Sequence, residues 1–173
     1  MLYWDGERIT KAFSVLIDFF QSPLKTLQKK KYGKQVCIDF IAIMYWIQAL
    51  VTSPFLYKTM GVEAVIINIL FMFFISLPLA HASLWLNSYI IYILAKFLGE
   101  DHKRESYYAV VSLPNIILLL PMQGVFLYAG SLAYIIQWYL LFFRVKMSWY
   151  ASTFIVFAPA ALLFGIMYFL GFA

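Results

Sequence analysis

The chain is poor in the residues that cross-link small secreted domains and in the charges that keep globular domains soluble. It has a single cysteine, Cys37, which excludes an internal disulfide framework and a CxxC-type metal site. Only 12% of its 173 residues are charged, against about 25% in an ordinary soluble domain. Because 64% of the residues are hydrophobic, a globule of this size has too little interior to hide them. The composition therefore predicts contact with lipid.

Motifs for catalysis, cofactor binding and nucleic-acid binding are also missing. The sequence has no HExxH pair, no GxSxG and no glycine-rich phosphate loop. Its densest ionisable cluster, residues 100–105, has no second group of metal ligands to match it, so we interpret it as a polar turn. The net charge of +5 comes from basic residues that flank apolar segments, which favours a membrane surface over nucleic acid. We expect a protein that is not an enzyme and has no cofactor or metal.

Residues 8–20 have the spacing of an amphipathic helix, with apolar side chains every three or four positions. Pro23 suits the first turn of a second helix, and Gly33 suits its stop. We expect residues 1–35 to lie on the cytoplasmic membrane surface, with the apolar face in lipid and lysines near anionic headgroups. Packing of the same face on a partner protein is the alternative. The residues expected to make these contacts are Phe13, Ile17, Phe20, Lys29, Lys30 and Lys31.

Long apolar stretches fill the rest of the chain, residues 36–173. A crossing needs about 20 mostly apolar residues. The stretch 63–98, which we expect to be kinked at Pro78, is too long for one perpendicular crossing and short for two. One crossing there places twelve of the thirteen Lys and Arg residues on the cytoplasmic side, whereas two crossings move five of these twelve to the outside. The five expected crossings are residues 36–57, 63–98, 107–121, 125–143 and 149–172.

The predicted fold is thus an all-α integral membrane protein of five transmembrane helices, preceded by an amphipathic interfacial helix. The amino terminus is expected inside the cell and the carboxyl terminus outside. The fourth and third crossings are expected to meet in a tight hairpin around Pro121 and Gly124.

Polar side chains within the crossings are costly, and they are the candidates for function. Asp39 lies near the start of the first crossing, where it either reaches the interface or pairs with Lys34. His81 lies in the middle of the second crossing, and Asn87 lies further along the same helix. Such groups either hold helices together by hydrogen bonds or line a pathway for a solute, and both interpretations stay open.

Three segments, in order, resemble the Yip1 domain family of small multi-spanning membrane proteins. "FFQSPLKTL" is similar to the amphipathic, proline-containing segment before the first crossing in prokaryotic members. "ILAKFLGEDHKRESYYAVVSLPNIILLLP" is similar to the central signature of the family. There, a long helix ends in a glycine, a polar turn follows, and a Tyr-Ala segment leads to a proline. The matching positions are Gly99, Tyr108, Ala109 and Pro114. Two closing helices with basic residues between them fit the last hairpin of the family.

The resemblance implies a non-catalytic scaffold, adaptor or membrane-shaping protein of the trafficking type in a prokaryotic cell membrane. Eukaryotic members bind Rab-type GTPases through a longer cytoplasmic region, for which this chain has no counterpart, so that binding is not carried over. The expected partners are anionic membrane lipids, together with a protein partner or a second copy of the chain. A small transporter or channel that uses His81 and Asn87 is the alternative function.

Overall fold

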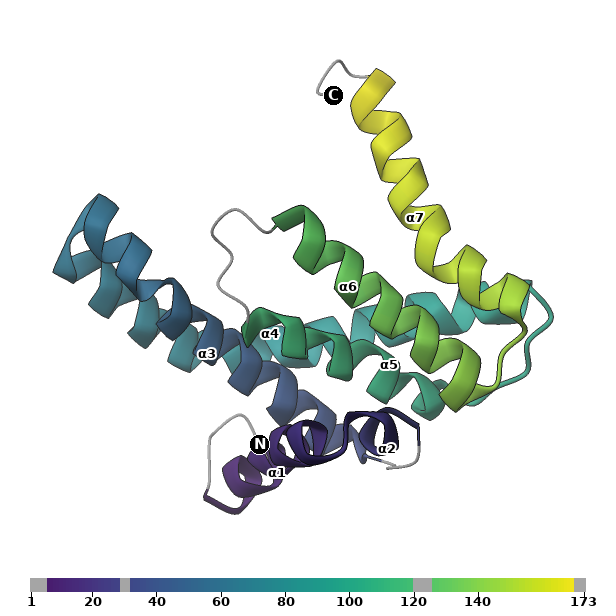
Figure 1. The fold of residues 1–173 in the computed structure, drawn as a ribbon, viewed down its shortest axis with the longest axis horizontal. Helices are drawn as coiled ribbons and strands as arrows, with labels where there is room; N and C mark the ends of the chain where they lie inside the picture. The colour runs from purple at the N-terminus through teal and green to yellow at the C-terminus, as the bar shows by residue number, and fades with distance from the viewer. Residues whose placement is uncertain (1–5, 29–31, 120–125, 170–173) are drawn as a thin grey trace.

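The computed structural model describes residues 6–28, 32–119 and 126–169, and the regular structure in these ranges is entirely helical. Two short helices at the amino terminus lie across one end of α3, and α3 and α4 form a long antiparallel pair (Figure 1). The remaining helices pack along this pair, and α7 leans away from them towards the carboxyl terminus (Figure 1). In chain order the elements are α1 (Gly6–Gln21), α2 (Pro23–Gln28), α3 (Lys34–Met60), α4 (Val62–Phe97), η1 (Arg104–Tyr107), α5 (Tyr108–Ser112), η2 (Leu113–Leu119), α6 (Phe126–Tyr139), η3 (Leu140–Val145) and α7 (Trp149–Phe169).

The two amino-terminal helices meet at a tight connection. The Ser22 amide donates to the Asp18 carbonyl at 2.9 Å, and the Thr26 amide donates to the Ser22 carbonyl at 3.0 Å. Pro23 begins α2, as predicted, because the first turn of a helix does not need its missing N–H. The expected role of Gly33 as a helix stop is wrong. Gly33 stands directly before α3 in an extended conformation, a position that tolerates glycine as a cap.

A single residue, Gly61, joins α3 to α4. Its φ of 85° and ψ of −179° lie in a region that residues with a side chain avoid, and this conformation lets the chain reverse. Beyond it, α4 runs as one helix of 36 residues from Val62 to Phe97, with Pro78 inside, and so matches the predicted stretch 63–98 to within one residue. Both α3 and α4 are long and apolar enough to cross a membrane, which makes the chain compatible with membrane association.

The outer surface of α4 is covered with large apolar side chains. They occur along its full length rather than on one stripe, so most of them face away from the core. A soluble monomer rarely exposes a continuous apolar surface of this extent, whereas lipid covers it without cost. The exposed side chains are Ile66, Ile67, Leu70, Phe71, Phe73, Phe74, Leu79, Trp85, Leu86, Tyr89, Ile90, Ile93 and Phe97.

The predicted third crossing, 107–121, is not a continuous α-helix. After α5 the backbone changes to the tighter 3₁₀ form in η2, which contains Pro114. Proline has no N–H for the α-helical ladder and restricts the residue before it, so the change falls where the sequence places this residue. Together α5 and η2 extend roughly 20 Å, against a hydrocarbon core of about 30 Å. The described part of this segment therefore extends over about two thirds of that thickness.

The last two predicted stretches, 125–143 and 149–172, coincide with α6 plus η3 and with α7 over the part that the structure describes. The hairpin that we expected around Pro121 and Gly124 lies outside the described residues.

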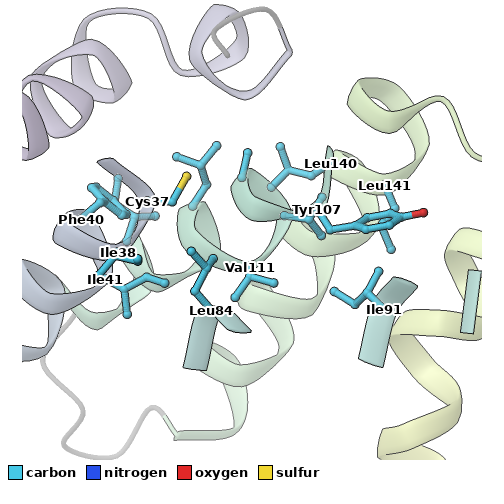
Figure 2. Packing of buried hydrophobic residues seen from close by; sticks show 14 of the residues in the cluster. Cys37, Ile38, Phe40, Ile41, Leu84, Ile91, Tyr107, Val111, Leu140 and Leu141 are labelled. Carbon is cyan, nitrogen blue, oxygen red and sulfur yellow. The ribbon is translucent and has the colours of Figure 1, made fainter. Parts of the chain in front are cut away.

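The buried core lies where α5 and the elements on either side of it pass between α3, α4 and η3. Figure 2 shows Ile38 and Ile41 of α3 on the same side of this cluster as Leu84 of α4 and Val111 of α5. At the other end, Tyr107 lies beside Leu140, Leu141 and Ile91 (Figure 2). The short central helix α5 is thus enclosed by the longer helices around it.

Candidate functional site

The helix α1 has one apolar face buried in the protein and a second one that is exposed. Ala12 and Val15 are buried, and Leu16 and Phe19 pack beside them against the core. Because α1 contacts the long helix α3 and the short helix α2, this inner face is the one by which α1 docks on the protein. The amphipathic pattern of residues 8–20 therefore serves two surfaces rather than one.

The exposed apolar face is the set of residues that we predicted to contact lipid. Phe13, Ile17 and Phe20 are 36%, 54% and 66% exposed, and we call them the apolar row. Leu24, in α2, is exposed as well. The polar side of α1 carries Lys11, whose ammonium group pairs with Glu7 at 2.5 Å. The helix α1 thus has three sides: one buried, one exposed and apolar, and one exposed and polar. An interfacial helix that is docked on a membrane protein needs all three.

Asp39 is buried and pairs with Arg8 of α1. Our prediction that it reaches the interface or pairs with Lys34 is therefore wrong. Arg8 donates from one terminal nitrogen to Asp39 Oδ1 at 2.5 Å and from Nε to Oδ2 at 3.1 Å. Gln35 adds a hydrogen bond from Nε2 to Oδ1 at 2.9 Å. The Arg8 and Asp39 side chains are 15% and 2% exposed, so water contributes little to holding either charge. This two-pronged pair fixes α1 on α3 and sets the direction of the apolar row.

Sequence reasoning missed Arg8, although the signal was present. Arg8 precedes Ala12 by one turn and Val15 by two, so it belongs to the inner face of α1. A basic residue in line with buried positions needs a buried acceptor, and Asp39 is the acidic residue of the neighbouring apolar stretch. The lysines Lys29, Lys30 and Lys31 lie outside the described residues, and their contact with headgroups stays a prediction.

The polar turn after α4 is tied to its surroundings. Arg104 donates from Nε to Ser88 Oγ at 3.1 Å and from a terminal nitrogen to the Trp85 carbonyl at 2.8 Å. Its guanidinium lies 5.5 Å from the Trp85 ring centre and 5.4 Å from that of Tyr89. These contacts anchor the turn on α4, a role that the sequence did not suggest for Arg104.

Glu100 ties the same turn to the beginning of α7. The Ser148 amide donates to Glu100 Oε1 at 2.8 Å, and His102 Nε2 lies 3.3 Å from Oε2. Hydrogen bonds from Ser148, and then the neighbouring His102, hold the pKa of Glu100 below its usual 4.5. The part of the chain that the structure describes has no group of three or more His, Cys, Asp or Glu side chains placed to hold a metal ion.

The positions that carry the family resemblance lie around this turn. Gly99 ends α4 as predicted, with a φ of 80°. The Glu100 amide donates to the Ala95 carbonyl and the Gly99 amide to the Lys96 carbonyl, the pair of bonds of a Schellman motif. The other three positions are Tyr108, which begins α5, Ala109, which is buried, and Pro114, which lies in η2.

Asn87 and His81 lie on different sides of α4. Asn87 lines a cavity of about 380 Å³ between α3, α4, η2 and α6, and its Nδ2 donates to the Ser83 carbonyl at 3.0 Å. His81 is exposed and is not among the residues that line this cavity. Among the residues that the structure describes, the polar side chains around the cavity are uncharged, which suits a neutral, hydrogen-bonding ligand. They are Tyr45, Ser83, Asn87, Asn115, Tyr134 and Gln137.

Comparison with protein-family models, with curated proteins and with solved structures finds no match to this chain.

Proposed function

We propose that the chain is an integral membrane protein that acts without catalysis, as a Yip1-like scaffold or membrane-shaping protein. In this proposal α1 and α2 lie in the cytoplasmic interface of one leaflet, and the apolar row enters the lipid. One observation carries the proposal: the exposed apolar row belongs to a helix that the buried Arg8–Asp39 pair fixes to the first long apolar helix.

The energetics favour insertion of the apolar row. Full burial of a large apolar side chain contributes about 1.5–3 kcal/mol. Scaled by the exposed fractions of Phe13, Ile17 and Phe20, transfer of the row into lipid contributes about 2–5 kcal/mol. Because α1 is already attached to α3, this gain is not offset by the cost of association. Three bulky side chains in one leaflet widen that leaflet relative to the other, which is the physical basis of membrane shaping.

The wider topology belongs to the same proposal. Five crossings, with the amino terminus in the cytoplasm of a prokaryotic cell, keep twelve of the thirteen Lys and Arg residues inside. Two of these crossings are α3 and α4. At about 54 Å, α4 is longer than the hydrocarbon core of about 30 Å, so it tilts or extends into the interface. Arg104, Trp85 and Tyr89 form a basic and aromatic group suited to that interface.

The topology is tested by single-cysteine labelling from each side of sealed membranes, in a Cys37→Ala background. A probe at position 102 is expected to react from the cytoplasm and one at position 173 from outside. If position 102 reacts from outside and position 173 from the cytoplasm, residues 63–98 cross twice. That result, or both probes reacting from the same side, would refute the five-crossing arrangement.

The membrane-shaping activity is tested by reconstituting the full chain into large vesicles and measuring vesicle diameter by electron cryomicroscopy. The wild type is expected to reduce the diameter or produce tubules at high protein density. A variant with serine at positions 13, 17 and 20 should leave the vesicles unchanged. The control variant Ser14→Ala, on the polar side of the same helix, should act like the wild type. Equal activity of the triple variant and the wild type would remove the apolar row from the mechanism.

A second candidate function, a small transporter or channel for uncharged solutes, is supported by the cavity beside Asn87. The variant Asn87→Ala would then reduce solute flux into reconstituted vesicles, whereas His81→Ala, outside the cavity lining, would not. Unchanged flux in Asn87→Ala, or wild-type flux no higher than that of empty vesicles, would leave the scaffold as the better proposal.

A further inference from the structure

A second cavity lies between the carboxyl end of α2 and the turn that follows α4. Its volume is about 410 Å³, and α2, η1 and η3 contribute to its wall. These elements lie next to the polar turns of the chain and not along the apolar middle of α3 or α4. The polar side chains that line it are Gln28, Tyr32, Lys103, Glu105, Ser106 and Arg144.

Arg144 is held in place at the wall of this cavity. One terminal nitrogen donates to the carbonyls of Thr26, at 3.2 Å, and Leu27, at 3.1 Å, and the guanidinium lies 5.7 Å from the Tyr32 ring centre. These contacts use the carbonyls at the end of α2, where a cation is favoured. Arg144 therefore presents a fixed positive charge, and Lys103, the residue directly before η1, adds a second one.

Tyr32 supplies a buried hydroxyl that has no hydrogen-bond partner among the described residues. The neighbouring Thr26 hydroxyl donates to the Asp18 carbonyl instead, at 2.9 Å. Burial, and then the charge of Asp18, raises the pKa of Tyr32 to about 12, so the hydroxyl keeps its proton at neutral pH. Buried polar groups normally have a partner, and the Tyr32 side chain lines the same cavity as Lys103 and Arg144.

We propose that this cavity binds a phosphate group, with Lys103 and Arg144 as its cations and the Tyr32 hydroxyl as a neutral donor. The Ser106 hydroxyl is a further donor on the same wall. The carboxylate of Glu105 suits a hydroxyl or ammonium group on the far side of the phosphate, so a phosphodiester headgroup fits better than inorganic phosphate. Basic pockets between membrane helices at the cytoplasmic face are suited to such headgroups. The site shares no residue with the apolar row, so it does not depend on membrane shaping.

The test uses the full chain in dodecyl maltoside, a detergent without phosphate, titrated with phosphatidylglycerol and followed by native mass spectrometry. Lys103→Gln and Tyr32→Phe are each expected to weaken binding about tenfold, because each removes a donor to a charged group. Lys96→Gln removes an exposed charge from the last turn of α4, outside this cavity, and should bind like the wild type. The melting temperature of ligand-free Tyr32→Phe should fall little, because the described residues offer its hydroxyl no hydrogen bond to lose.

Competition with sn-glycerol 1-phosphate separates the two sources of the phosphate. A lipid site is shown by phosphatidylglycerol binding at least about tenfold tighter, since the acyl chains add apolar contact. Equal affinity for the two would support the phosphate site and assign it to a soluble phosphate ester. The proposal is overturned if Lys103→Gln and Lys96→Gln weaken binding equally, or if neither Lys103→Gln nor Tyr32→Phe weakens it.

Discussion

Substitution of Arg8 by methionine should release α1 from α3. Asp39 is 2% exposed, so the change leaves a buried carboxylate whose cationic partner is gone. Breaking a buried ion pair from one side costs about 3–5 kcal/mol. Each kcal/mol shifts the unfolding midpoint of a domain this size by about 2–4 °C, so we expect a fall of roughly 6–20 °C. The double variant Arg8→Met, Asp39→Leu should recover most of the loss, because an apolar pair needs no charge compensation.

The measurement is thermal unfolding in dodecyl maltoside, followed by tryptophan fluorescence. Lys11→Met is the matched control, since it removes the Lys11–Glu7 pair from the same helix. Both partners of that pair are largely exposed, and surface pairs contribute about 0–1 kcal/mol, so the control should shift the midpoint by no more than about 4 °C. Equal shifts for Arg8→Met and Lys11→Met, or a double variant no more stable than Arg8→Met, would refute the role of the buried pair.

Three further predictions concern the turns and the basic segment. Because the pKa of Glu100 is lowered in the folded chain, its stabilisation is complete above pH 4.5 and is lost as the pH falls through the lowered value. The stability difference between the wild type and Glu100→Gln, from chemical unfolding at several pH values, should therefore shrink in acid; a constant difference would contradict this. Gly61→Ala should lower the free energy of unfolding by about 1–3 kcal/mol in the same assay, because Gly61 has a positive φ. Gly33→Ala should lower it by less than about 1 kcal/mol, because the φ of Gly33 is −67°. Equal losses for the two variants would refute the strain at Gly61. Replacing the lysines at 29–31 with glutamate should weaken the binding of the amino-terminal segment to anionic vesicles, but not to neutral ones, in a vesicle flotation assay. Unchanged binding to anionic vesicles would show that these lysines do not contact the headgroups.

The helices with a clear pattern could be predicted from the sequence. The three-and-four spacing of residues 8–20 corresponds to α1, and the unbroken apolar stretch 63–98 corresponds to α4. The change from α5 to η2 could not be predicted in the same way. Pro114 marks a restriction on the backbone, but several outcomes satisfy it, and packing between α3 and α6 selects among them.

The positions of some candidate residues could likewise be predicted from the sequence, and those of others could not. The exposure of Phe13, Ile17 and Phe20 follows from periodicity, although the second, buried face of α1 does not. His81 and Asn87 are six positions apart on a helix, which places them on different faces. Because α4 is apolar all round, its sequence does not indicate which face turns inward. The pairing of Asp39 with Arg8, 31 positions away, depends on how α1 docks, and local spacing carries no information about that contact.

The central claim, that the apolar row of α1 lies in lipid, is tested most directly by spin labels on α1. Single labels at positions 17 and 14, in a Cys37→Ala background, are compared in vesicles that contain anionic lipid. The label at Ile17 is expected to collide mainly with oxygen, which concentrates in the bilayer, and the label at Ser14 mainly with a water-soluble nickel complex. If both labels collide mainly with the nickel complex, α1 lies in water and the account is wrong.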